Sequence, residues 1–209
     1  MTIRRYFDSD ALTLDTEVLA CEPDDDGHFR VRLAETPFHP QGGGQPSDTG
    51  RIGAARVLHV VADGEAIVHR TERAVAPGEV SVEVDAATRA LHARLHSAGH
   101  LIGYAGAASG WRAVKGHHWP GEARVVFEPD EGARPIEAGA FAREVDAVVA
   151  AALPRTMRIR DGVRVIGFGE FEAYGCGGTH VASSEQVGRI VIVRLKEKKG
   201  QLTVHYEVA

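Results

Sequence analysis

Two short segments of this sequence carry side chains that together can hold a metal ion. His96 and His100 are separated by three residues in LHSAGHLI, and Cys176 and His180 by three residues in YGCGGTHV. On a helix, this spacing places both side chains on one face, so each segment offers half of a tetrahedral site. Imidazole nitrogen and thiolate sulfur suit Zn²⁺ better than Mg²⁺ or Ca²⁺, which prefer oxygen. The spacing therefore predicts a zinc site of three histidines and one cysteine.

The second segment gives this prediction its weight, because a histidine pair alone is commonly structural and the chain has eleven histidines. A buried structural cysteine does not require a histidine four residues later, nor two glycines between them that let the backbone approach a ligand. His92, one turn before His96, is interpreted as a bystander; a third donor or a partner of a ligand are the alternatives. Cys21, the only other cysteine, is predicted to be a small core residue, which leaves no disulfide framework.

Composition restricts the class of protein. A length of 209 residues with 44% hydrophobic residues predicts a globular chain of one or two domains. The start of the chain has no signal-peptide pattern, and no segment holds eighteen uninterrupted apolar residues, so we expect a cytoplasmic protein that does not associate with membranes. The net charge of −5 gives no overall attraction to nucleic acid. Residues 155–164 and 188–200 are nevertheless locally basic and permit phosphate contact.

The first part of the chain has the pattern of a small β domain. Short segments with alternating or β-branched apolar residues are separated by the turn sequences DDDG, ADGE and APGE. Such spacing predicts a small barrel or sandwich, and we place this domain, with its Gly-rich GGGQ loop, at residues 1–85. The expected strands are 16–21, 29–33, 57–62, 67–70 and 80–84.

The second part combines helices and strands. Asp85 stands at the N-cap position of a helix expected over 86–108, which carries His96 and His100. An amphipathic segment at 136–153, stopped by Pro154, predicts a packing helix. We expect an α+β domain at 86–209 in which helices pack on an antiparallel sheet. Its expected strands are 157–160, 163–168, 190–195 and 202–208.

Several of these motifs, in this order, resemble the editing domain of alanyl-tRNA synthetase and the freestanding alanyl-tRNA editing proteins of the AlaX group. They are the HSAGH segment with the following Leu101, the CGGTH segment at 176–180, TPFHPQGGGQPSDTG at 36–50, and KGHHW at 115–119 followed by a strand at 124–127. The resemblance covers almost the whole chain. It departs from the family at residues 97–99, where the synthetase pattern usually reads HTATH, so that a bulkier threonine beside the pocket is lost.

The resemblance implies a trans-editing hydrolase that deacylates mischarged tRNA(Ala), chiefly Ser-tRNA(Ala) and also Gly-tRNA(Ala), at its acceptor end. A chain of this length has no room for an aminoacylation domain, so we expect the freestanding form. Zn²⁺ would polarise the ester or activate water. A catalytic zinc keeps one position open, so we expect firm bonds from His96, His100 and Cys176 and a longer one from His180.

The remaining candidate residues would contact the substrate. Gly43, Gly44 and Gln45 offer backbone N–H groups without a neighbouring Cβ and an amide that can both donate and accept, although a plain turn explains them equally well. Lys115 is a candidate for phosphate contact, and Thr179 for substrate contact or for tying down its turn. Two alternatives to an editing enzyme remain: a non-catalytic zinc-stabilised RNA-binding module, and a zinc hydrolase acting on another ester or amide.

Overall fold

The computed structural model describes residues 1–209 and divides them into two compact units. The first unit comprises Met1–Gly42 and Pro46–Ala90, and the second comprises Gly43–Gln45 and Leu91–Ala209. The tip of the Gly-rich segment therefore groups with the second unit, although its flanks belong to the first. No helix in the structure is both long enough and apolar enough to span a membrane.

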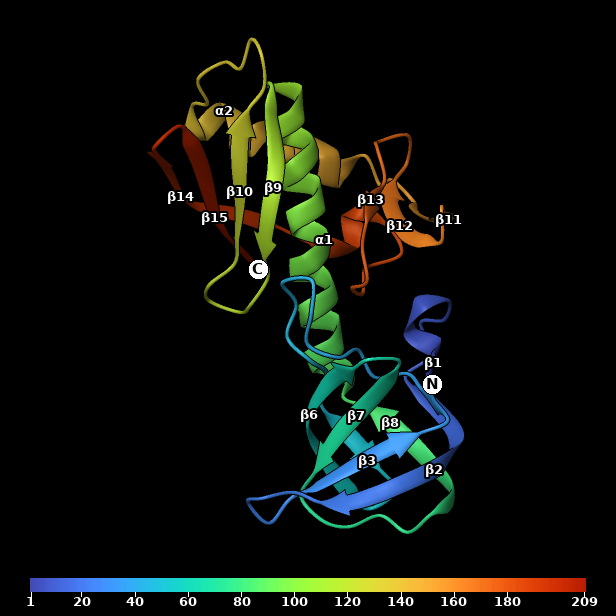
Figure 1. The fold of residues 1–209 in the computed structure, drawn as a ribbon. Coiled ribbons are helices and arrows are strands. Elements are labelled where there is room, and N and C mark those ends of the chain that lie inside the picture. Colours follow the sequence, from blue (N-terminus) through green and yellow to red (C-terminus); the bar gives the residue numbers. More distant parts are fainter. The chain divides into compact units, whose positions relative to one another are not determined.

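The first unit is built on six antiparallel strands whose pairings return to the starting strand, so that they form a closed barrel in the order β2-β3-β7-β6-β5-β8 (Figure 1). Alternation buries one face of each strand; in β3, for example, Val31 and Leu33 are fully buried. The strands are β2 (Thr13–Pro23), β3 (Phe29–Leu33), β5 (Gly50–Ile52), β6 (Ala55–Asp63), β7 (Ala66–Thr71) and β8 (Gly78–Val84). A short parallel pair, β1 (Ile3–Arg4) and β4 (Glu35–Thr36), and a 3₁₀ turn at Arg5–Phe7 complete the unit.

A buried ion pair fixes the segment that leads into and out of the Gly-rich loop. The Arg89 guanidinium contacts the Asp48 carboxylate and donates to the Pro37 carbonyl at 2.6 Å. Asp48, which is fully buried, also accepts from the His39 backbone N–H at 2.6 Å. Asp48 thus shapes this segment.

Helix α1 (Ala86–Ala108) begins where the sequence predicts. The Asp85 carboxylate accepts from the Thr88 backbone N–H at 2.7 Å, which is N-cap geometry, and this hydrogen bond lowers the pKa of Asp85. The helix starts in the first unit and continues through the second. Its middle turns carry His92, His96 and His100, all buried.

In the second unit, α1 and α2 (Ala138–Ala150) cover one face of a four-stranded antiparallel sheet (Figure 1). The order in the sheet is β14-β15-β10-β9. Its core joins Leu101 and Ile102 of α1 and Phe141 of α2 to Phe127 and Tyr206 of the sheet. The strands are β9 (Trp111–His117), β10 (Arg124–Pro129), β14 (Ile190–Lys198) and β15 (Gln201–Val208).

A second antiparallel sheet of this unit leads into the CGGTH segment. Its strands are β11 (Arg155–Arg160), β12 (Val163–Phe168) and β13 (Tyr174–Gly175), in that order, and a 3₁₀ turn follows at Ser184–Val187. The predicted class, helices combined with antiparallel sheets, is confirmed. The packing helix is shorter than expected because Glu137 caps it through the N–H groups of Gly139 and Ala140. The sequence pattern missed the strands β1, β4, β5, β9 and β13.

Candidate metal centre and adjoining cavity

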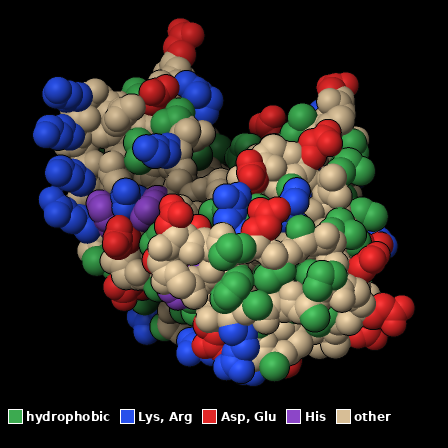
Figure 2. Space-filling model, turned by 60° about the horizontal axis from the view of Figure 1, so that its bottom comes forward, with side chains coloured by type: hydrophobic (Ala, Val, Ile, Leu, Met, Phe, Trp, Pro, Cys, Tyr) green, Lys and Arg blue, Asp and Glu red, His purple; other side chains and the backbone are tan.

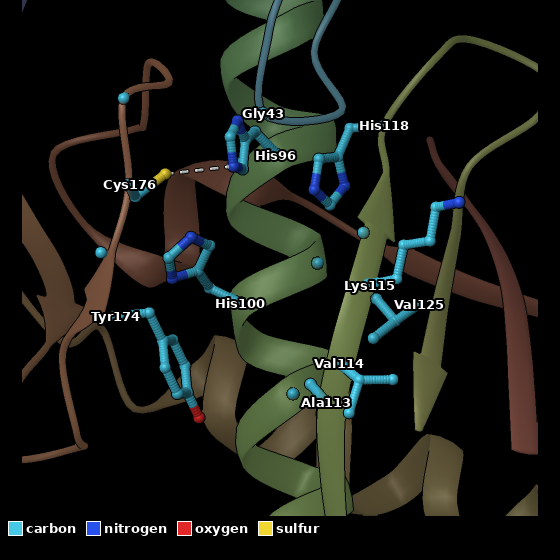
Figure 3. Close-up of a pocket in the computed structure, with 15 residues that line it drawn as sticks. Gly43, His96, His100, Ala113, Val114, Lys115, His118, Val125, Tyr174 and Cys176 are labelled. Carbon is cyan, nitrogen blue, oxygen red and sulfur yellow. Dashed lines mark hydrogen bonds between the residues drawn. The ribbon is translucent and has the colours of Figure 1, made fainter. Parts of the chain in front are cut away.

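The four predicted donors meet at one point in the second unit. His96 and His100 reach it from α1, and Cys176 from the loop after β13 (Figure 3). His180 comes from the same loop. Their ligand atoms all lie within 4.8 Å of one another. The sequence prediction that distant segments jointly form this cluster agrees with the structure, which contains no ion.

Three of the distances between donor atoms match those of a tetrahedral metal site. Cys176 Sγ lies 3.3 Å from His96 Nε2 and 3.6 Å from His180 Nε2, and the Nε2 atoms of His180 and His100 are 3.2 Å apart. Zinc bonds of about 2.0–2.1 Å to nitrogen and 2.3 Å to sulfur place tetrahedral neighbours roughly 3.3–3.6 Å apart. The donor set therefore suits Zn²⁺ in both chemistry and size. The longer bond expected for His180 stays a prediction.

Gln45 holds the first of these ligands from behind. The Thr179 backbone N–H donates to Gln45 Oε1 at 3.0 Å, which identifies this atom as the amide oxygen. His96 Nδ1, 2.8 Å from the same oxygen, must then carry a proton and leave Nε2 free to bind a metal. The Gln45 amide also donates to Thr179 Oγ1 at 2.9 Å. Gln45 and Thr179, predicted to bind substrate, thus contact each other and support a ligand.

Two arginines hold the backbone of the CGGTH loop. Arg164 donates to the carbonyls of Cys176 and Gly178, both at 2.9 Å, and Arg155 donates to the His180 carbonyl at 2.7 Å. Arg164 is buried. The two ends of the basic stretch 155–164 therefore position metal ligands, which accounts for part of the local charge that the sequence assigned to phosphate contact.

The electrostatic surroundings keep the imidazoles neutral. Burial lowers the pKa of His100 to about 4 and also lowers the pKa of His180, with Arg164 acting in the same direction. Neutral imidazole has the lone pair that a metal requires. Burial raises the pKa of the Cys176 thiol, so metal binding at neutral pH must displace its proton.

A cavity of about 280 Å³ adjoins the cluster on one side. His96, His100 and Cys176 line it, whereas His180 does not. The rest of the wall comes from α1, β9 and the following His118, β10, β13 and its loop, and the Gly-rich tip, and it contains no aspartate or glutamate. A molecule in this cavity would meet three of the four donors.

The other predicted substrate contacts are distributed around the cavity. Gly43 lines it, while Gly44 packs so closely on β9 that a Cβ would lie 2.5 Å from the Gly116 carbonyl oxygen. Lys115 lies at the rim, and its side chain points away from the histidine cluster (Figure 3). His92, the expected bystander, is buried but does not belong to the four-donor cluster.

The sequence analysis did not identify His118, which lies in the cavity wall. Its ring is 5% exposed and stacks on His96, with ring centroids 4.3 Å apart (Figure 3). Burial lowers the pKa of His118 to about 3. His118 belongs to the KGHHW motif. In the sequence, only Gly99 hinted at its role, because a glycine at this position leaves room for the His118 ring; that proximity exists only in the folded chain.

Comparison with known proteins gives the geometry its context. Residues 163–203, which include Cys176 and His180, match the family described as Threonyl and Alanyl tRNA synthetase second additional domain. The chain is 29% identical to Alanyl-tRNA editing protein Aarsd1 of Bos taurus over 97% of its length, and 29% identical to that of Danio rerio over 84%. The chain is homologous to the alanyl-tRNA editing proteins.

The relationship extends to the ligases. The chain is 30% identical to Alanine--tRNA ligase of Methanocella arvoryzae over 77% of this chain, which corresponds to 21% of that ligase. The chain spans about half the length of the two editing proteins, 53% and 48% respectively. The resemblance drawn from the motifs is thus confirmed.

Proposed function

We propose that this chain is a zinc-dependent trans-editing hydrolase that deacylates mischarged tRNA(Ala), with Ser-tRNA(Ala) as its main substrate and Gly-tRNA(Ala) as a second. One observation carries the proposal: four zinc-type donors meet at one point, and three of them line a cavity. The similarity to alanyl-tRNA editing proteins supports tRNA(Ala) as the substrate class. The freestanding form and the cytoplasmic location stay predictions.

The reaction is the hydrolysis of an ester between an amino acid and the terminal ribose. A hydrolytic site is needed in addition to the aminoacylation site of a synthetase. An aminoacylation pocket built for alanine cannot strongly reject an amino acid that differs by one small group. Bound Zn²⁺ would supply Lewis acidity to the ester carbonyl or to an attacking water. Modest rate acceleration suffices, because an ester is already activated relative to an amide.

The residues of the chain hold this site in place. Gln45 fixes the tautomer of His96, while Arg155 and Arg164 fix the loop that carries Cys176 and His180. Because the cavity wall has no carboxylate, no aspartate or glutamate serves as a general base. Proton transfer then falls to water, to a ribose hydroxyl of the tRNA or to a wall histidine.

A basic sheet face offers a surface for the tRNA backbone. Val204 and Tyr206 of β15 are buried against the helices, so the alternate residues Thr203 and His205 point to the other face. Cross-strand pairs extend these two positions into two rows of side chains across the sheet. Figure 2 shows Lys and Arg side chains in a row along one edge of the molecule, with histidines beside them. The rows are Arg194-His205-Arg124-His117 and Lys196-Thr203-Val126-Lys115.

This face ends at Lys115, on the rim of the cavity. We infer that it contacts phosphates of the acceptor stem, because cations spaced along a strand match the repeating charge of the backbone. In this surface, Arg194 and Lys196 belong to the predicted basic stretch 188–200, and Lys115 is the predicted phosphate contact.

One alternative has support of its own. Four protein ligands close a zinc coordination sphere, as structural sites do, so the cluster also fits a non-catalytic zinc-stabilised RNA-binding module. The cavity beside three of the donors favours the enzyme. A hydrolase acting on another ester or amide would use the same site, and the substrate panel below separates the two.

The test is to incubate the zinc-loaded protein with Ser-, Gly- and Ala-charged tRNA(Ala). We expect release of serine fastest, of glycine more slowly, and of alanine slowest. The half-buried Cys176 ligand provides the matched variant: Cys176→Ala should lose zinc and deacylation together. Hydrolysis of none of the three by the zinc-loaded protein would reject the editing function.

A further inference from the structure

The wall of the cavity contains a site built to receive the imidazole of His118. A Cβ on Gly99 of α1 would lie 2.4 Å from His118 Cε1, and a Cβ on Gly116 of β9 would lie 2.5 Å from His118 Nε2. Neither distance is possible without displacing the ring. The absence of side chains at these two positions therefore makes the space that His118 occupies.

This finding gives a physical reason for the departure from the HTATH pattern. The position usually held by threonine is Gly99 in this chain. The imidazole of His118 fills the volume next to it and is 5% exposed. The hydroxyl that a threonine would present beside the cavity is thus replaced by a ring nitrogen from another strand.

Hydrogen bonds determine which ring nitrogen faces a ligand. The Tyr206 hydroxyl donates to the Leu95 carbonyl at 2.9 Å. It must therefore accept from His118 Nδ1, which lies 2.7 Å away. Nε2 is left as an unprotonated acceptor, and none of its neighbours in the protein donates to it.

The charge of the surroundings selects the kind of donor that Nε2 can accept from. The groups packed around the ring are the ligand His96, the further histidines His100 and His117, and the Tyr206 hydroxyl. Cys176 is the only potential anion in the cavity wall, and its charge would be taken up by a bound metal. Because a bound metal already brings a positive charge, a second cation is disfavoured in the cavity. A neutral hydroxyl is therefore a better hydrogen-bond donor to Nε2 than an ammonium group.

We propose that His118 is a specificity-determining residue that accepts a hydrogen bond from the side-chain hydroxyl of a seryl ester. This inference rests on the proposed function and adds the means of substrate selection. An alanyl or glycyl ester would leave the buried Nε2 without a partner, at a cost of free energy. The site would thereby favour serine over both smaller amino acids.

Two substitutions separate the roles of the two ring nitrogens. His118→Asn keeps a polar atom near the place of Nδ1 for Tyr206 but removes the acceptor in the cavity. His118→Gln places an amide oxygen near the place of Nε2. His28→Asn, in the hairpin between β2 and β3 of the first unit, is the matched control, because His28 does not line the cavity. Zinc content and the unfolding midpoint are measured for every variant.

We expect His118→Asn to lower the ratio of kcat/KM for Ser-tRNA(Ala) to that for Gly-tRNA(Ala) by roughly tenfold to a hundredfold, the effect of one unpaired buried polar group. Its zinc content should change little, and its rate on glycyl ester should stay the same or rise, because no acceptor is then left without a partner. His118→Gln should recover much of the ratio, and His28→Asn should leave it within about twofold.

Three results would overturn the proposal. An unchanged ratio in His118→Asn would show that His118 does not contact the serine hydroxyl. An equal loss on both esters, with zinc retained, would assign His118 to a group common to both, such as the α-amino group. If the wild-type protein hydrolyses neither ester, the proposed function itself fails, and the role of His118 falls with it.

Discussion

Removal of the Gln45 side chain should weaken zinc binding without touching a ligand. Gln45 is fully buried and makes three hydrogen bonds: to His96 Nδ1 at 2.8 Å, to the Thr179 N–H at 3.0 Å and to Thr179 Oγ1 at 2.9 Å. Gln45→Ala removes all three. The N–H groups of His96 and Thr179 then remain buried without this acceptor, at about 1–3 kcal/mol each.

Only part of this cost is expressed in metal affinity. The hydrogen bond to His96 orients the ring and fixes its tautomer, and loss of such a partner typically costs 10–100-fold in affinity, or about 1.4–2.7 kcal/mol. The contacts to Thr179 stabilise the loop in both the metal-free and the metal-bound protein. We therefore expect the Kd for zinc to rise roughly 10–100-fold and the metal-free protein to unfold more easily.

The assay is competition between the metal-free protein and a chromophoric chelator at fixed pH. Gln41→Ala, in the same Gly-rich segment but exposed, is the control and should bind zinc as the wild type does. A Kd for Gln45→Ala within about twofold of the wild type, in a folded protein, would refute the role assigned to Gln45. It would also remove the reason for considering the loop tip as part of the zinc site.

Three further predictions test other parts of the structure. Gly99→Ala should lower the free energy of unfolding by about 1–3 kcal/mol, because its Cβ would collide with His118. Gly103→Ala, whose Cβ would make an ordinary 3.7 Å contact, should raise the free energy of unfolding by up to about 1 kcal/mol. Equal effects of the two substitutions in thermal melts would contradict this packing. His69, fully buried in the barrel, has a pKa lowered by burial to about 4, so its contribution to stability is present above about pH 6.5 and is lost as the pH falls towards 4. The free energy of unfolding, measured by urea titration, should fall over that window by up to about 3 kcal/mol, and a His69→Gln variant with an equally steep profile would exclude His69 as the cause. Lys196→Ala should reduce the slope of log Kd for tRNA against log salt by about 1, more than Arg158→Ala on β11 does, and an unchanged slope would remove the sheet face from the RNA interface.

Much of the site could be predicted because its residues follow spacing rules. The i, i+4 pair on α1 and the Cys–Gly–Gly–Thr–His segment specify metal chemistry locally, and the order of motifs indicates which segments must meet. The helix start at Asp85 follows equally directly from capping chemistry. The barrel strands have alternating apolar residues because one face of each is buried.

The rest depends on contacts that have no local signature. Strand β9 was missed because its central residues are exposed and do not alternate; cross-strand pairing with β10 defines it. The role of Gln45 arises from a contact across 134 residues with Thr179. The place of His118 depends on the space beside Gly99, and the two residues come into contact only in the folded chain. Arg155 and Arg164 were interpreted by their charge, whereas their hydrogen bonds to carbonyls define their role.

The most direct test of the central claim is to titrate zinc into the metal-free protein while the rate of Ser-tRNA(Ala) deacylation and the fold are monitored together. The account predicts that the rate rises in proportion to zinc and stops rising at one ion per chain, with circular dichroism nearly unchanged throughout. It also predicts no rise for Cys176→Ala. A rate independent of zinc, or a rate that appears only as the second unit folds, would contradict a catalytic metal held by His96, His100, Cys176 and His180.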